Sequence, residues 1–291
     1  MDSKILSFRN VGNKIVYNPT IPFKHNGKEY IGVRIESFDS ESDSEICFAY
    51  RHSDHWIIDN SLPSFQLQDP ALTTVKDNIL LSGVYYVEKT PDGSLKLRTD
   101  FYLGPDISRL KKIASGPWGM KDIRIVEMDE GIGIFTRPQK REYGKGKIGF
   151  LRIKNLDELK YFFEEQWYKA TIIDGLFDQN HWGGVNQAIR LSKDKYIGVI
   201  GHVAHQTINE NGELQKHYYA MSFIFNPETL NHSEMKIIAT RNDFPKSLSK
   251  RSPELDDVLF PGGIDTSGHL YCGLSDCCVG RIKIKNPFEI L

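Results

Sequence analysis

The segment Gln68-Asp69-Pro70 carries the carboxylate with the strongest case for chemistry in this chain. It precedes an alternating apolar segment, Asn78–Tyr86, which has the pattern of a half-buried strand. Proline disfavours helical conformation for the residue before it, so we expect Asp69 to be extended at the mouth of a strand. A carboxyl group held there can meet a ligand and exchange a proton with it.

Similar polar sites recur along the chain. Asn18 lies within Tyr17-Asn18-Pro19, Asp122 follows Lys121, and Gly183-Gly184-Val185-Asn186 opens a later apolar segment. Asn18, Asp69 and Asp122 are separated by near-equal intervals. This recurrence predicts a radially repeated β fold in which the polar sites converge on one place.

Strand patterns dominate the rest of the sequence. Segments rich in β-branched and aromatic residues are Lys28–Ser37, Glu45–Tyr50, Asn78–Glu88, Ile132–Pro138, Lys147–Ile153, Lys195–His202, His217–Phe225 and Leu270–Leu274. Turn signals separate them, at His25-Asn26-Gly27, Pro91-Asp92-Gly93, Asp129-Glu130-Gly131, Asn209–Gly212 and Thr266-Ser267-Gly268. These spacings suit four-stranded meanders, and we expect one all-β domain over residues 1–291.

Two helices interrupt the predicted strands. Asn155 and Glu158 have the spacing of a capping box, and Leu156, Leu159, Phe162, Phe163 and Trp167 follow at helical intervals. We expect this helix to be a short connector packed on the outside of the β body. A second short helix is expected over Ile107–Ala114.

The composition excludes several classes of protein. The chain has 291 residues with 37 basic and 38 acidic side chains, which argues against a dedicated nucleic-acid binder. The longest apolar run, Tyr196–Ala204, is broken by His202 and is too short to span a bilayer. No signal-peptide pattern follows Met1, so we expect a cytoplasmic location without a membrane partner. The four cysteines do not have the spacing of a disulfide framework, so we expect reduced thiols.

Cofactor motifs are missing from the sequence. It contains neither a His-x-x-x-His nor a Glu-x-x-His helix motif, so we expect no metal site. No glycine-rich loop leads from a strand into a helix, so nucleotide chemistry is not indicated. No feature of the sequence indicates an oligomeric state.

In order and spacing, the motifs resemble those of the five-bladed β-propeller glycosidases and phosphorylases, most closely glycoside hydrolase family 130 (GH130), the β-mannoside phosphorylases and hydrolases. The resemblance extends from Tyr17 to Ile282. It is carried by Tyr17-Asn18-Pro19, Gly32–Glu36, Asp69-Pro70, Lys121-Asp122, Thr136-Arg137-Pro138, Gly201-His202, Tyr218, Phe260–Gly263 and Tyr271–Asp276. It implies a five-bladed β-propeller with an oligosaccharide substrate.

The resemblance also implies roles for single residues. Asp69 matches the family's proton donor, which works through a substrate hydroxyl, and inorganic phosphate would be a co-substrate held by Lys121, Arg137 and His202. A hydrolase would need a second carboxylate, for which we expect Asp122, with Glu127 and Asp276 as alternatives. The expected substrate-binding residues are Asn18, Arg34, Lys121, Arg137, His202, Tyr218 and Asp276. Trp118, Trp182, Tyr218 and Tyr271 offer aromatic faces for sugar stacking.

The chain also departs from the family pattern. Gln68 replaces a Glu, Thr136 replaces a His that helps to bind phosphate, and Gly201 replaces a Tyr. Hydrolysis therefore stands as an alternative to phosphorolysis. So do a glycosidase of other specificity and a propeller that binds sugar or protein without catalysis. The enzyme would be favoured over a binding propeller if one pocket contained Asp69, Lys121, Arg137 and Asp276.

At several positions a purely structural role competes with the functional one: Lys121 and Arg137 could form a solvated rim, and Asp122 and Asp276 could close turns through backbone amides. Arg34 could simply pair with Glu36, two residues along the same strand. His202 could be a hydrogen-bonded core histidine on an apolar strand. The sequence leaves these alternatives open.

Overall fold

The computed structural model describes residues 2–87, 96–139, 143–161, 166–191, 196–246 and 251–289. Its regular elements are almost all strands, so the predicted all-β class is confirmed. The first sheet has the order β2-β7-β6-β5-β3, with β4 added to β5. Its strands are β2 (Ser7–Arg9), β3 (Lys14–Tyr17), β4 (Phe23–His25), β5 (Lys28–Ser37), β6 (Glu45–His52) and β7 (His55–Ile58).

The next two sheets are four-stranded meanders. The second contains β8 (Gln68–Val75), β9 (Asn78–Val87), β10 (Lys96–Gly104) and β11 (Lys111–Ser115). The third contains β12 (Arg124–Glu127), β13 (Ile132–Thr136), β14 (Gly149–Ile153) and β15 (Thr171–Ile172). In both sheets consecutive strands pair antiparallel, as the turn signals predict.

The last sheet has eight strands because two meanders are joined in it. One is β16 (Trp182–Arg190), β17 (Ile197–Ile208), β18 (Leu214–Phe225) and β19 (Lys236–Ala239). The other is β20 (Asp257–Ile264), β21 (His269–Leu274) and β22 (Cys278–Lys283), completed by β1 (Ser3–Ile5). The join is a short parallel pairing of β18 with β20, at His217 with Asp257 and Tyr218 with Val258.

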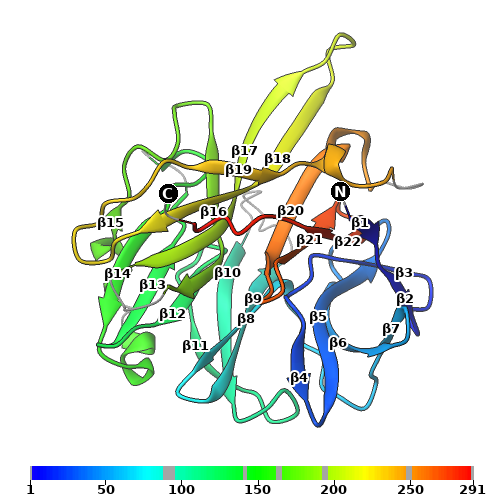
Figure 1. Ribbon diagram of the computed structural model, residues 1–291, viewed down its shortest axis with the longest axis horizontal. Coiled ribbons are helices and arrows are strands. Elements are labelled where there is room, and N and C mark those ends of the chain that lie inside the picture. Colours follow the sequence, from blue (N-terminus) through cyan, green and yellow to red (C-terminus); the bar gives the residue numbers. More distant parts are fainter. Residues whose placement is uncertain are drawn as a thin grey trace.

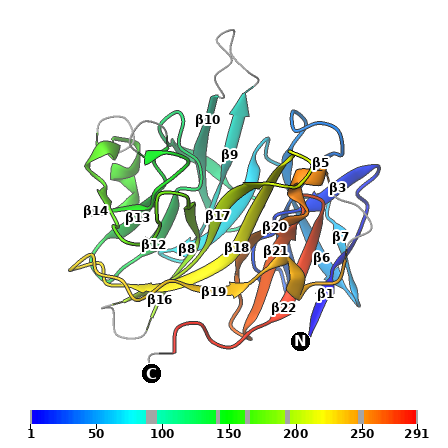
Figure 2. The ribbon, with the colours of Figure 1, turned by 90° about the horizontal axis from the view of Figure 1, so that it is seen from above.

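The strand groups follow one another around the molecule in sequence order (Figure 1). The N-terminal strand β1 pairs antiparallel with β22, matching Ser3 with Ile282, so the first strand of the chain lies beside the last one (Figure 2). The protein is thus a nearly closed arrangement of sheets. Closure in this way leaves few sheet edges open to other chains.

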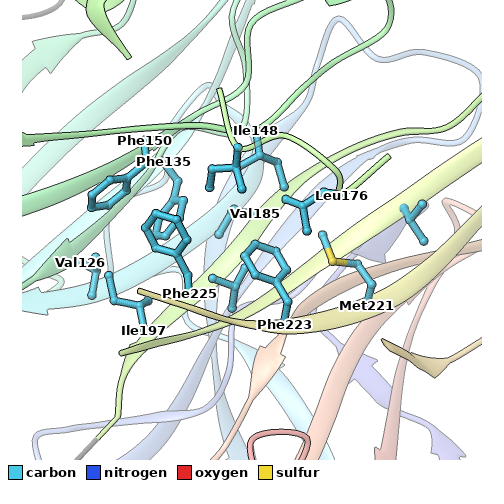
Figure 3. Close-up of a cluster of buried hydrophobic side chains, with 13 residues drawn as sticks. Val126, Phe135, Ile148, Phe150, Leu176, Val185, Ile197, Met221, Phe223 and Phe225 are labelled. Carbon is cyan, nitrogen blue, oxygen red and sulfur yellow. The ribbon is translucent and has the colours of Figure 1, made fainter. Parts of the chain in front are cut away.

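In the described part of the chain the core consists of five apolar clusters, each between consecutive strand groups. The cluster between the third sheet and β16–β18 contains Phe135, Phe150, Phe223 and Phe225 (Figure 3). The rings of Phe150 and Phe225 are 4.8 Å apart at 65°, an edge-to-face contact. Another cluster packs Tyr271 and Val279 against the first sheet, so apolar contact also joins the last strands to the first.

Two helix predictions need correction. Ile107–Ala114 is a turn followed by β11, not a helix. The segment after Asn155 begins as a 3-10 turn, Leu156–Glu158, and Leu159–Tyr161 are helical. Asn155 accepts a hydrogen bond from the Asp157 amide, but Glu158 accepts from Lys154 rather than from Asn155, so the expected capping box is not formed.

Some predicted features lie outside the described residues. They are Phe162, Phe163, the turn Pro91-Asp92-Gly93, Glu88 and Lys195. Within the described ranges, no helix has both the length and the apolar character needed to cross a membrane.

Gly262, in β20, tests the contact between the last strands and the first. A Cβ at Gly262 would lie 1.8 Å from the carbonyl oxygen of Pro19. Gly262→Ala should therefore force the two backbones apart and lower the free energy of unfolding by about 3 kcal/mol or more, measured by urea denaturation. Gly12→Ala is the control, because no atom lies within 4 Å of its added Cβ and only left-handed strain, with φ of 62°, is introduced. Equal losses in the two variants would contradict a tight contact at Gly262.

Candidate active site

One polar pocket collects most of the residues singled out in the sequence. The cavity is about 200 Å³. Its lining includes eight predicted site residues, namely Asn18, Arg34, Asp69, Lys121, Arg137, His202, Tyr218 and Asp276. Side chains from all the strand groups therefore meet in one cavity, as the recurrence of polar sites predicts.

Asp69 reaches the pocket through a bulge in β8. The ladder with β9 shifts register between Gln68 and Ala71, and Asp69 has a φ of 47°. This corrects the expectation of an extended Asp69: its backbone is left-handed, a conformation that Asp tolerates better than most residues. Asn18, also before a proline, has a φ of 44°, and Asp122 has a φ of 58°. The same local device therefore turns three polar side chains inward.

The Asp69 carboxylate is tightly held. Its Oδ1 accepts a hydrogen bond from the Asn18 amide at 2.7 Å and from the Arg34 guanidinium at 2.8 Å. The residue is buried, with 7% of its surface exposed. One oxygen of the carboxylate is therefore committed to positioning contacts.

Arg34 pairs with both Asp69 and Glu36, so the two roles left open by the sequence coexist. Its Nε and Nη2 lie 2.8 and 2.7 Å from Glu36 Oε2, and its guanidinium packs 4.8 Å from the centre of the Tyr17 ring. Glu36 is fully buried, and its other oxygen contacts the Tyr17 hydroxyl and Arg251. Glu36 thus supports the pocket from behind.

Asp122 does not line the pocket. Its buried carboxylate accepts a hydrogen bond from Arg137 Nη1 at 2.7 Å, and Arg124 Nη2 lies 3.7 Å from its other oxygen. The structure therefore places this predicted catalytic carboxylate behind Arg137, where it orients the guanidinium. Arg137 Nε also donates to the carbonyl of Gly183 at 2.8 Å, and a Cβ at Gly184 would lie 2.7 Å from Arg137 Cδ. The Gly183-Gly184 pair is needed for this close approach.

His202 is buried in the wall between two aromatic rings. Its Nδ1 lies 2.8 Å from Asn186 Oδ1, and its ring stacks on Tyr218 with centroids 5.7 Å apart and lies tilted against Phe260 at 4.9 Å. Burial, together with Arg137 and Lys121, holds the pKa of His202 well below its ordinary value, so the imidazole is neutral. Nδ1 then donates to Asn186, and Nε2 is an acceptor that has no partner among the described residues.

Asp276 occupies a turn that is rare for residues other than glycine. Ser275 and Asp276 have φ values of 51° and 48°, and the Cys277 amide donates to the Leu274 carbonyl at 3.1 Å. This is the pattern of a type I′ hairpin, which ordinarily favours Asn-Gly. The strained Ser-Asp pair places the Asp276 carboxylate in the pocket.

Asp69 and Asp276, two of the carboxyl groups that line the pocket, have pKa values shifted in opposite directions. Burial raises the pKa of Asp69, but Arg34 and Lys121 outweigh it, so the net pKa lies below its ordinary value. Burial raises the pKa of Asp276 to about 6, with Arg34 opposing and Asp69 reinforcing the rise. At slightly acidic pH Asp69 is therefore ionised while Asp276 is protonated.

Sequence reasoning missed several residues of this site. Glu41, Lys216, Leu255 and Val258 also line the pocket, and Arg124 and Arg251 support it from behind. Glu41 stands in a polar loop and Lys216 on a half-buried strand segment, and neither belongs to a recognisable motif. Across the described ranges, no three His, Cys, Asp or Glu side chains are grouped as metal ligands.

The raised pKa of Asp276 gives a test based on stability. Because its folded pKa of about 6 exceeds the ordinary 3.8, the stabilising effect of its proton is complete at low pH and is lost as pH rises through 6. Asp276→Asn should therefore be more stable than the wild type at pH 8, by at most about 3 kcal/mol, and equal to it near pH 4. Melting temperatures from pH 4 to 8 measure the difference. Parallel curves for the two proteins would show that Asp276 is not held protonated.

Comparisons with known proteins show the family of the chain and the solved structures that it resembles. A family model described as "Protein of unknown function (DUF1861)" matches residues 1–290. A search of curated proteins gave no match. MPT-4, a mannose phosphorylase from Leishmania mexicana solved with phosphate ion, is 30% identical with a TM-score of 0.88, over 99% of this chain and 89% of that one.

Two further solved structures extend the comparison. MPT-1, a GDP-Man-dependent mannosyltransferase from Leishmania mexicana, is 31% identical with a TM-score of 0.87, over 99% of this chain and 90% of that one. A GH130 structure, from a study of hydrolases that target β-1,2 mannosidic linkages in Candida mannan, has a TM-score of 0.64 at 14% identity, over 96% and 86% of the two chains. This last similarity concerns the fold. The chain therefore belongs to the DUF1861 family, and its fold is GH130-like.

Proposed function

We propose that this protein is a carbohydrate-active enzyme that cleaves β-mannosides or related oligosaccharides by phosphorolysis. The observation that carries the proposal is the pocket itself. It brings Asp69 together with Lys121 and Arg137 in a chain related along nearly its whole length to a mannose phosphorylase. A propeller that only binds sugar would not need a carboxylate beside two cations in its pocket.

The scaffold that we propose is a single five-bladed β-propeller over residues 1–291. Five apolar clusters support the count, since each fills the space between consecutive strand groups. The parallel join of β18 with β20 would then link two neighbouring blades. The pairing of β1 with β22 would close the ring.

In the proposed reaction, an oxygen of inorganic phosphate attacks the anomeric carbon while the glycosidic C–O bond breaks. The leaving oxygen takes a proton from a hydroxyl of the substrate, and that hydroxyl regains a proton from Asp69. The products are a sugar 1-phosphate with inverted configuration and a shortened oligosaccharide. Holding both reactants in one cavity supplies the orientation.

Lys121 is the cation best placed to bind the phosphate. It lines the pocket and has no hydrogen-bond or ion-pair partner in the described ranges. Arg137 adds positive charge, but each of its three nitrogens already donates a hydrogen bond, to Gly183, Asp122 and Lys145. His202 would contribute as an acceptor for a P–OH or sugar hydroxyl, because its Nε2 carries no proton.

Phosphate binding would also prepare Asp69 for its role. Without phosphate, Lys121 helps to lower the pKa of Asp69 and keeps it ionised. A phosphate anion beside Lys121 adds negative charge, which raises the pKa of a nearby carboxyl group. Asp69 would thus carry the proton that it donates once phosphate is bound.

Mannosyl transfer from a nucleotide sugar is the second candidate, because the mannosyltransferase MPT-1 is as similar to this chain as the phosphorylase. Both reactions move a mannosyl group, and they differ in donor and acceptor. Hydrolysis is a variant of the first candidate, phosphorolysis. It is kept because Thr136 replaces a phosphate-binding His and Asp276 offers a second carboxylate in the pocket.

A glycoside panel assayed with and without phosphate separates these reactions. We expect mannobioses to be cleaved only when inorganic phosphate is present, with mannose 1-phosphate as product. Products are followed by anion-exchange chromatography, with GDP-mannose in a parallel set. Phosphate-independent release of mannose would favour hydrolysis, and turnover of GDP-mannose alone would favour the transferase. No turnover in any set would refute the enzyme proposal.

Asp69→Asn tests the assigned proton donor. Loss of a general acid lowers turnover by about 10²–10⁴-fold. We also expect lower stability at pH 7, because the buried Arg34 loses one of its carboxylate partners. Initial rates on the best glycoside and the melting temperature measure the two effects.

The matched control for this variant is Asp77→Asn, at the exposed turn beyond the far end of the same strand, where φ is also positive. It should keep wild-type rate and stability. A wild-type rate in Asp69→Asn would mean that another group donates the proton.

A further inference from the structure

Of the four aromatic residues expected to stack on sugars, Trp118 stands out by its exposure. Tyr218 lines the pocket, the buried Trp182 donates to the Tyr218 hydroxyl at 3.4 Å, and Tyr271 belongs to the apolar core. Trp118 leaves 52% of its surface exposed. Exposing an indole forfeits the burial that normally stabilises it, so a fixed and exposed Trp points to a binding surface.

The indole of Trp118 is backed by a cation and a second ring. The Arg98 guanidinium carbon lies 4.4 Å from the centre of the Trp118 ring and 5.1 Å from that of Tyr85. The two rings lie 6.3 Å apart. Cation–π contacts of this kind fix one side of the indole and leave another side open to solvent.

Arg98 is itself held in place. Its Nε lies 2.9 Å from Asp100 Oδ1, while the other Asp100 oxygen accepts a hydrogen bond from Lys112 at 2.6 Å. Asp100 is buried, so this ion pair is protected from solvent. The cation behind Trp118 therefore has a defined position.

The backbone that carries Trp118 is also fastened. The amides of Gly116 and Gly119 donate to the carbonyls of Thr99 and Leu97, each at 2.7 Å. Gly119 has a φ of 83°, which glycine adopts without strain. Because this platform is already rigid, little conformational entropy would be lost when a ligand binds to it.

This platform lies beside the pocket. Trp118 precedes the pocket residue Lys121 by three positions, so their Cα atoms are at most about 11 Å apart. Gln68, another pocket residue, pairs across the sheet with Val84, and the adjacent Tyr85 pairs with Arg98. Strand neighbours are about 4.8 Å apart, so the platform is within reach of a ligand that leaves the pocket. β9 and β10 extend beyond the neighbouring strands on this side (Figure 2).

We propose that Trp118, backed by Arg98 and Tyr85, is a distal subsite that binds the third or a later sugar of an oligosaccharide whose reacting end lies in the pocket. This inference rests on the proposed function. The C–H-bearing face of a pyranose is apolar and matches an exposed indole, while its hydroxyl groups stay in water. The platform therefore selects for chain length.

The test measures binding by calorimetry in the full-length protein carrying Asp69→Asn, so that ligand is not consumed. The probes are a mannobiose and a mannotetraose of the linkage that the glycoside panel selects. We expect the tetraose to bind about tenfold more tightly than the biose. Adding Trp118→Ala should abolish this advantage and leave the affinity for the biose unchanged, whereas Trp118→Phe should restore part of it.

Tyr161→Ala serves as the control, because Tyr161 is also exposed, at 65%, and belongs to the segment after β14. It should leave the tetraose advantage intact. The inference is wrong if Trp118→Ala keeps the advantage or if it weakens binding of the biose as much as binding of the tetraose. Failure of every protein to bind either mannoside would instead reject the proposed function and the subsite together.

Discussion

The site depends on one buried guanidinium, that of Arg34, which neutralises two carboxylates at once. Glu36 holds it from behind and Asp69 receives it in front. Removing these charges from water costs free energy, and a buried ion pair contributes little net stability. The function of the ion pairs is instead to position Asp69. Its carboxylate is ionised and fixed in a cavity, where a substrate can reach its second oxygen.

Equal numbers of basic and acidic side chains surround this pair, and a bound anion can change the protonation of the acidic ones. Lys121, Arg137 and Arg124 stand on one side, with Asp69, Asp122 and Asp276 on the other. The cations hold two of the carboxylates ionised, whereas burial keeps a proton on the third at mildly acidic pH. Because the groups are close and shielded from water, an anion bound beside Lys121 would change the protonation of its neighbours.

The fold provides this convergence through local irregularities in regular sheets. The left-handed backbone at Asn18 and Asp69 and the strained turn at Asp276 bring side chains into the pocket, and the left-handed Asp122 holds Arg137 from behind. Such conformations cost of order 1–3 kcal/mol each and persist when the surrounding structure fixes them. The phenylalanine-rich packing between sheets and the pairing of β1 with β22 supply that fixation.

The sequence by itself determined the strands, their antiparallel order and most of the pocket residues, because alternation and turn chemistry are local and the motif order is preserved. It did not determine that Asp69 is left-handed, that Asp122 lies behind Arg137, or that Ile107–Ala114 is not helical. Those outcomes depend on which groups from distant strands meet: Asp122 is drawn to two arginines, and β11 takes its conformation from pairing with β10. The protonation of Asp276 and the exposure of Trp118 were likewise decided by the tertiary structure, since burial and charge at a point are sums over residues far apart in the chain.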